Sequence, residues 1–160
     1  ISTHGIISEE DGQFRLFGST FNAGNKYTSF SLREDILRVL DTLPCHKFVL
    51  VDACHSGAYA DNGRKGSDRV CVVASCAAQE SSYEDDVWQN GAFTKALKDL
   101  LSNPATLDTD GSKGLTIGEL FGKLQTDVGS LVRKSRGSST KQTPFMEEGT
   151  LGDKTALWGY

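Results

Sequence analysis

Two short apolar runs constrain the fold of this chain more than any other feature. The first covers residues 47–53 and the second residues 69–74. Neither run alternates apolar with polar side chains until its end, a pattern that is typical of strands buried on both faces of a parallel sheet. Because such a sheet has helices on both of its faces, the two runs predict an α/β protein.

Helical periodicity appears before and after these runs. Ser31 stands where it can cap a helix that ends before Pro44. The apolar face of this first helix is expected to contain Leu32, Ile36, Val39, Leu40 and Leu43. Residues 92–101 carry a second amphipathic pattern, and Thr116 with Glu119 forms a capping box before a third helix. Strands that alternate with helices in this way predict a mostly parallel central sheet.

Length, charge and cysteine content narrow the classes of function. The chain has 160 residues, which predicts one domain, and its 17 Lys and Arg against 21 Asp and Glu give a formal charge of −4. This composition does not favour nucleic-acid binding, which needs clustered cations. No apolar run approaches the ~20 residues of a membrane span. Four cysteines are too few for a disulfide scaffold, so we expect a reducing, cytoplasmic setting.

Two reactive residues stand where strands are expected to end. Cys54 follows the first apolar run, where a thiol is accessible instead of packed inside a strand. His4 follows a short strand-like start, and Gly5 behind it permits close approach of a second backbone. Each residue alone is also compatible with a packing or surface role. Sites in parallel sheets gather at the carboxyl ends of strands, so the pair together indicates an active site.

Several motifs around these two residues resemble the catalytic core of the caspase-like cysteine peptidases, especially the metacaspase and bacterial caspase-homologue branch. The similar segments are residues 2–5, 49–57, 90–97, 108–111, 115–120 and 142–144. The resemblance therefore extends over nearly the whole chain. It implies a caspase-like three-layer α/β/α sandwich around the central sheet, and hydrolysis of peptide bonds.

The resemblance also implies roles for individual residues. Cys54 is the expected nucleophile, which forms a thioester, and His4 is the expected acid and base. The backbone N–H groups of Gly5 and Cys54 are the expected oxyanion hole. Thr3 stands where the family usually has glycine, and we interpret this change as tolerated.

Substrate preference is predicted from charge. In the metacaspase-like branch, an aspartate two residues before the nucleophile lines the first pocket and selects Arg or Lys, and Asp52 matches that position. Asp52 is alternatively an acceptor for backbone N–H groups of the turn. Ser75 matches a second family position in the pocket. Arg64 and Lys65 lie in the loop where this family cleaves itself, so they are candidate self-cleavage sites, with an ordinary solvated turn as the alternative.

No cofactor is expected. The family's calcium site uses an aspartate after the nucleophile, matched by Asp61, and an upstream acidic pair. Residues 30–32, taken as that upstream region, contain no such pair, so we expect no calcium requirement. Asp108, Asp110 and Gly111 resemble half of an EF-hand loop, but the closing glutamate position is Ile117. A turn is therefore the preferred interpretation.

The expected unit, residues 1–160, is the part of a caspase-like peptidase domain that bears the catalytic residues. Strands that normally lie upstream are expected from a preceding segment or a companion chain. A regulatory domain or subunit is a further expected partner, and the substrate is a protein or peptide. One alternative function is a catalytically silent scaffold of the same fold. Another is a metal-binding module, although its candidate ligands lack metal-ligand spacing; they are His4, Cys45, His46, Cys54, His55, Cys71 and Cys76.

Overall fold

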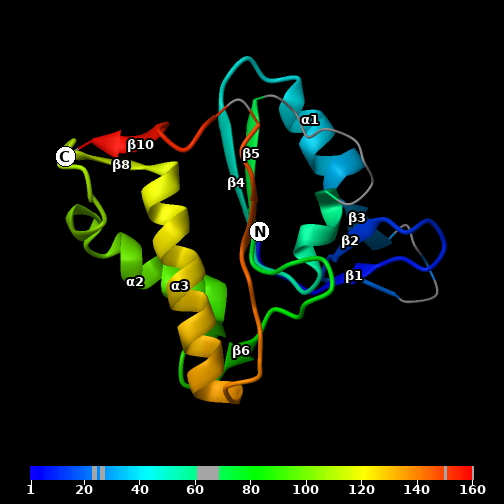
Figure 1. The fold of residues 1–160 in the computed structure, drawn as a ribbon. Coiled ribbons are helices and arrows are strands. Elements are labelled where there is room, and N and C mark those ends of the chain that lie inside the picture. The colour runs from blue at the N-terminus through cyan, green and yellow to red at the C-terminus, as the bar shows by residue number, and fades with distance from the viewer. Residues whose placement is uncertain (23–24, 26–27, 61–68, 150, 160) are drawn as a thin grey trace.

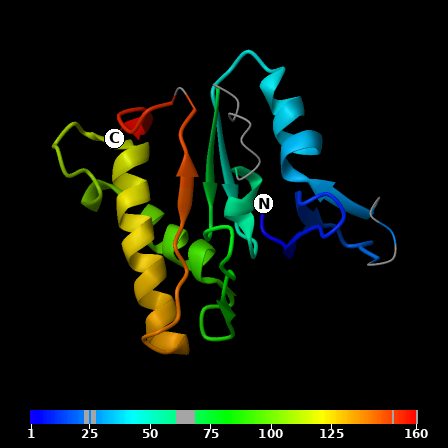
Figure 2. The same ribbon diagram turned by 45° about the vertical axis from the view of Figure 1, so that its right-hand side comes forward.

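The fold is a three-layer α/β/α arrangement, as the apolar runs predict. The computed structural model describes residues 1–22, 25, 28–60, 69–149 and 151–159. Its central sheet consists of β4 (Lys47–Val51), β5 (Val70–Ala74) and β9 (Phe145–Glu147). Helices α2 (Ala92–Leu101) and α3 (Ile117–Arg136) cover one face, and α1 (Arg38–Asp41) lies over the other (Figures 1 and 2).

Strand β5 is buried on both faces, which explains why its sequence shows no polar alternation. Val70 and Val72 belong to an apolar cluster with residues of the segment that leads into α1. Cys71 and Val73 belong to a second cluster with residues of α2 and α3. Successive side chains of a strand point to opposite faces, so a strand between two helical layers needs apolar residues at every position.

The central sheet contains the predicted parallel pairing and also one antiparallel strand. Strands β4 and β5 are parallel, with Lys47 opposite Val70 and Val51 opposite Ala74. Strand β9 joins the free side of β5 in the antiparallel direction. The sequence did not reveal β9 because this short strand contains no continuous apolar run, and Phe145 at its start is 38% exposed.

A second sheet carries the N-terminal part of the chain. Strands β1 (Gly5–Ile7), β2 (Phe14–Phe17) and β3 (Ser29–Ser31) form an antiparallel sheet in that order. Further short elements are the 3-10 turns η3 (Ser56–Ala60) and η4 (Pro104–Thr106) and the strands β6 (Glu84–Asp85), β7 (Asn90–Gly91), β8 (Gly114–Thr116) and β10 (Ala156–Gly159).

The first predicted helix begins where expected but is wound differently. The Ser31 hydroxyl accepts the N–H of Glu34 at 3.2 Å and caps a π-helix, η2 (Leu32–Leu37), which continues into α1. A π-helix has a wider turn than an α-helix, so different residues share a face. Val39 is 60% exposed and Leu43 is 44% exposed. Their predicted place on the apolar face was therefore wrong.

The other two predicted helices are confirmed. Helix α2 covers the predicted residues, and α3 begins after Thr116. The Thr116 hydroxyl accepts the N–H of Glu119 at 3.3 Å, and the Glu119 carboxylate accepts the N–H of Thr116 at 3.1 Å. This reciprocal pair is the predicted capping box. Within the described ranges, no helix is long and apolar enough to cross a membrane.

Candidate active site

A sharp turn at the carboxyl end of β4 presents Cys54. The chain leaves the strand after Val51, and His55 adopts the left-handed conformation with φ of 59° before η3 begins. Two contacts hold this turn against the segment after β5. The N–H of His55 donates to the carbonyl of Glu80 at 2.9 Å, and Nδ1 of His55 lies 3.0 Å from the carbonyl oxygen of Ala78. Both the backbone and the side chain of His55 therefore help to hold the turn in place.

The sulfur of Cys54 is fixed by the backbone of one residue. The N–H of Ser82 donates to Sγ at 3.3 Å, and the Cys54 thiol donates to the carbonyl of Ser82 at 3.5 Å. Cys54 is half-buried and forms no disulfide. The thiol is therefore oriented while part of it stays accessible.

His4 is positioned by its neighbours in the chain. The N–H of Thr3 donates to the carbonyl of Asp52 at 3.1 Å, which ties the start of the chain to the end of β4. The Thr3 hydroxyl donates to the carbonyl of Phe17 at 2.7 Å, and the N–H of Phe17 donates to the carbonyl of His4 at 3.1 Å. Thr3 therefore anchors the residue before the histidine to β2, while His4 itself is exposed.

One cavity of about 250 Å³ brings the predicted residues together. It is lined by Ser2, Thr3, His4, Asp52, Ala53, Cys54, Ser82, Tyr83, Glu84 and Gly91. Gly5 lies just behind it, because a Cβ added to Gly5 would stand 2.5 Å from the carbonyl oxygen of Cys54. The backbones of Gly5 and Cys54 are thus close neighbours.

The carboxylate of Asp52 is buried in the wall of this cavity and accepts three hydrogen bonds. The Ser82 hydroxyl donates to Oδ1 at 2.7 Å. The hydroxyl and the N–H of Thr94, in the first turn of α2, donate to Oδ2 at 2.6 and 3.2 Å. Among the described residues, no cationic side chain pairs with Asp52. Asp52 therefore accepts a backbone N–H of α2 and not one of the turn, and it also lines the cavity.

Ser75 is placed differently from the prediction. It is fully buried and does not line the cavity. Its hydroxyl accepts the N–H of Ala53 and donates to the carbonyl of Ala53, both at 3.1 Å. This geometry does not support direct contact with a substrate. Ser75 instead holds the residue that precedes Cys54.

Gln142 is a site residue that sequence reasoning missed. Its side-chain NH₂ donates to the carbonyl of Ser75 at 3.1 Å and to the hydroxyl of Ser82 at 3.2 Å. Its Oε1 accepts the N–H of Tyr83 at 2.9 Å. The only sequence signal was its place in the motif at residues 142–144, which carried no residue role.

The acidic residues after β5 serve different purposes. The carboxylate of Glu80 accepts the N–H of Thr143 at 2.6 Å and its hydroxyl at 3.1 Å, so Glu80 ties two segments together. Glu84 instead lines the cavity. The proposed self-cleavage residues Arg64 and Lys65, and also Asp61, lie outside the described residues, and their roles stay predictions.

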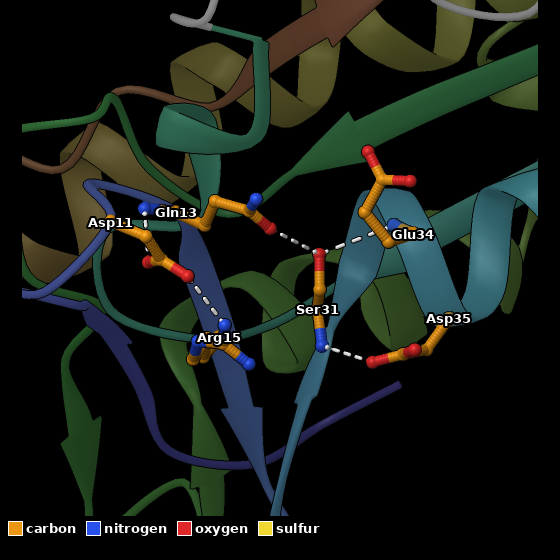
Figure 3. Close-up of polar contacts among 6 residues, drawn as sticks. All are labelled: Asp11, Gln13, Arg15, Ser31, Glu34 and Asp35. Carbon is orange, nitrogen blue, oxygen red and sulfur yellow. Dashed lines mark hydrogen bonds and ion pairs between the residues drawn. The ribbon is translucent and has the colours of Figure 1, made fainter. Parts of the chain in front are cut away.

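A second cavity, of about 260 Å³, lies beside the second sheet. Its lining residues are Asp11, Gln13, Phe14, Ser31, Arg33, Glu34 and Tyr59. Ser31 is central to the polar contacts there (Figure 3): its hydroxyl donates to Gln13 at 3.1 Å, and its N–H donates to the Asp35 carboxylate at 2.8 Å. Asp11 forms an ion pair with Arg15 at 2.6 Å.

This second cavity bears on the calcium question. Glu34 and Asp35 form an acidic pair just after the segment that sequence analysis took as the upstream region, and the fold brings Glu34 and Asp11 to one cavity. However, Asp11 and Asp35 already serve protein donors, and the guanidinium-bearing Arg33 lies in the same wall. Calcium takes six to eight oxygen ligands. These residues, as arranged, do not fit that requirement.

A cluster of acidic side chains lies at the turn between η4 and α3. Carboxylate oxygens of Asp108, Asp110 and Glu119 lie within 4.8 Å of one another. The N–H groups of Ser112 and Lys113 donate to Asp108 at 3.0 and 2.9 Å, as in a turn. In the described ranges, no group of cysteines and histidines comes together in this way, which gives the metal-module alternative no support.

Comparison with known proteins gives one match that covers most of the chain. The family model described as Caspase domain matches residues 2–155. The match spans both strand ends that carry His4 and Cys54, and it also includes Gln142. A search of curated proteins gives no match.

Proposed function

Because the chain belongs to the caspase-domain family of cysteine peptidases, with the α/β fold of that family, we propose that it is an endopeptidase that cleaves after Arg or Lys through Cys54 and His4. One observation carries this proposal. Cys54, His4 and Asp52 line a single cavity. These groups supply a nucleophile, an acid and base, and an anionic pocket.

The proposed reaction has two covalent steps. His4 takes the proton of the Cys54 thiol, and Sγ attacks the carbonyl carbon of the substrate. The backbone N–H groups of Gly5 and Cys54 stabilise the oxyanion, a contribution of about 2.7–4 kcal/mol for one such donor. The C–N bond then breaks as His4 gives a proton to the leaving amine, which leaves a thioester. Water, deprotonated by His4, attacks the thioester and releases the acid and the free thiol.

The preference for a cationic side chain follows from Asp52. A buried carboxylate is costly to leave without a positive partner, and no described cation supplies one. The donors from Ser82 and Thr94 orient the carboxylate but leave its charge uncompensated. An Arg or Lys side chain of the substrate would supply charge-assisted hydrogen bonds. Glu84 in the same wall adds to the negative potential.

We also propose that activity needs no calcium. Asp11 is paired with Arg15, and Asp35 accepts the N–H of Ser31, so neither carboxylate is set aside for a metal ion. The reaction above uses only the thiol, the imidazole and backbone N–H groups.

The central test compares peptides that end in Arg, Lys, Asp or Leu before a fluorogenic group. We expect the parent protein to cleave the Arg and Lys peptides and Cys54→Ala to cleave none. His4→Ala is expected to lower kcat by about 10²- to 10⁴-fold, because it removes the acid and base. Cys45→Ala is the matched control, since Cys45 is also a free, exposed cysteine but lies outside the cavity.

Four outcomes would contradict parts of this proposal. Hydrolysis that survives Cys54→Ala would eliminate the mechanism, and cleavage after Asp would eliminate the pocket assignment. Asp52→Asn should reduce cleavage after Arg and Lys mainly through a higher KM, and an unchanged preference would also contradict the role of Asp52. A folded parent that cleaves no peptide would favour the silent scaffold.

A further inference from the structure

One buried side chain joins the segment after β5 to two residues of the cavity wall. Gln142 is 2% exposed and precedes β9. Its amide reaches the carbonyl of Ser75 at the end of β5, the hydroxyl of Ser82 and the N–H of Tyr83. Only a side-chain amide offers both donors and an acceptor in one rigid plane, which suits these partners.

Ser82, which Gln142 holds, contacts both chemical centres of the site. Its backbone N–H and carbonyl bracket the sulfur of Cys54 at 3.3 and 3.5 Å. Its hydroxyl donates to Oδ1 of Asp52 at 2.7 Å. Movement of this one residue would therefore disturb the nucleophile and the pocket carboxylate together.

The hydrogen bonds from Gln142 to Ser82 and from Ser82 to Asp52 form a chain in which each group donates to the next. The NH₂ group of Gln142 donates to the Ser82 hydroxyl, so the hydroxyl proton is directed at Asp52. Each donor in such a chain polarises the next, and the low local dielectric strengthens the effect. Meanwhile the bond from the Tyr83 N–H to Gln142 holds the backbone of the same segment.

We propose that Gln142 is a positioning residue that fixes the Ser82–Tyr83 backbone against Cys54 and aims the Ser82 hydroxyl at Asp52. This inference rests on the proposed peptidase function and deepens it. One amide, which touches no substrate, fixes both the position of the nucleophile and the orientation of the carboxylate that selects the substrate. Loss of the amide affects reactivity of the thiol and recognition of the cationic side chain at once.

The chain offers a matched control for Gln142. Gln125, on α3, donates to the carbonyl of Pro144 at 3.0 Å, so it also holds the segment that contains Gln142. Gln125 is not among the residues that line the cavity. A variant at Gln125 therefore reports general loosening of this segment without loss of the bonds to Ser82 and Tyr83.

The experiment compares Gln142→Met, Ser82→Ala and Gln125→Met in a Cys45→Ala background, where the exposed cysteine cannot react. Three quantities are measured: the rate at which iodoacetamide alkylates Cys54, the kcat and KM for an Arg-ended peptide, and the thermal unfolding midpoint. We expect Gln142→Met to lower the alkylation rate and kcat/KM by about tenfold each, the scale of one lost hydrogen bond to a charged group. Gln125→Met is expected to leave both unchanged.

Ser82→Ala separates the two effects. It deletes the bond to Asp52 but keeps the backbone contacts to Cys54, so KM should rise about tenfold while the alkylation rate stays at the parental value. Ser82→Thr, which keeps the hydroxyl, should restore KM.

The outcomes distinguish this inference from the proposed function. Parental alkylation and kcat/KM in folded Gln142→Met overturn the inference, and so do equal losses in Gln125→Met. If Gln142→Met does not fold, an unchanged KM in Ser82→Ala overturns it. If the parent cleaves no peptide but Gln142→Met still slows alkylation, the positioning role stands and the peptidase function fails.

Discussion

At the scale of single residues, close contact with the backbone decides which side chains the site accepts. A Cβ on Gly5 would lie 2.5 Å from the carbonyl oxygen of Cys54 and 2.7 Å from the ring of Phe14. A Cβ on Gly91 would lie 2.5 Å from Oδ2 of Asp52. Real Cβ atoms do not approach so closely, so these two glycines are required by packing, with no need for unusual backbone angles.

Gly5→Ala should therefore damage the site. The added methyl group pushes β1 away from Cys54, and a shift of about 1 Å in reacting groups can lower the rate about a hundredfold. Gly122→Ala is the control, because nothing lies within 4 Å of a Cβ there, and alanine in a helix is favoured by up to about 1 kcal/mol. Parental kcat/KM in Gly5→Ala would contradict the steric argument.

At the scale of elements, the start of α3 is joined to the preceding loop by one carboxylate. Glu119 accepts the N–H of Thr109 at 2.7 Å and the hydroxyl of Thr116 at 2.8 Å, besides the capping bond to the N–H of Thr116. These donors lower the pKa of Glu119 from 4.5 to about 2, and the N–H of Thr109 has the largest effect. The charged form is thus favoured in the folded state.

This pKa predicts a pH-dependent contribution to stability. Because the folded pKa lies below the unfolded value, the contribution is complete above about pH 4.5 and is lost as the pH falls towards 2. Glu119→Gln should therefore be less stable than the parent at pH 7, and the difference should shrink in acid. Urea unfolding at several pH values measures it, with exposed Glu9→Gln as the control that changes little. A difference that grows in acid would contradict the assignment.

At the scale of the whole molecule, the acidic residues of the second cavity are brought together by several elements. Asp11 precedes β2, Glu34 belongs to η2, and Tyr59 belongs to η3. Because Arg33 lines the cavity and Arg15 pairs with Asp11, positive charge from the protein itself accompanies the carboxylates. We therefore expect the peptidase activity to need no divalent cation in this cavity.

Chelation tests this expectation directly. With EDTA present, peptide hydrolysis should be unchanged, and added CaCl₂ should not raise the unfolding midpoint, since only a ligand that binds the folded state stabilises it. MgCl₂ serves as the control for ionic strength. Activity that is lost with EDTA and restored by CaCl₂ alone would contradict the prediction, and Glu34→Gln would then identify the cavity as the site.

Much of the architecture was predictable because it depends on local patterns. The parallel pair β4 and β5, helix α2 and the capping box of α3 are confirmed, since burial on two faces, helical periodicity and capping are each encoded within a few residues. The π-helical turn after Ser31 was not predicted, because the same apolar spacing is compatible with an α-helix. The burial of Ser75 outside the cavity lining was not predicted either, because the direction in which a side chain after a strand points depends on its neighbours.

The position of Asp52 and Cys54 just after a buried strand could be predicted from the chain alone, because strand burial is encoded in a contiguous segment. His4 instead precedes β1, and the way in which all three residues are held depends on the tertiary fold. Gln142 meets Ser75 and Tyr83 across 67 and 59 residues of sequence, and β9 joins β5 across a similar span. Such contacts leave no periodic signal in the chain, because a buried amide or a short edge strand is defined by the partners that surround it in space.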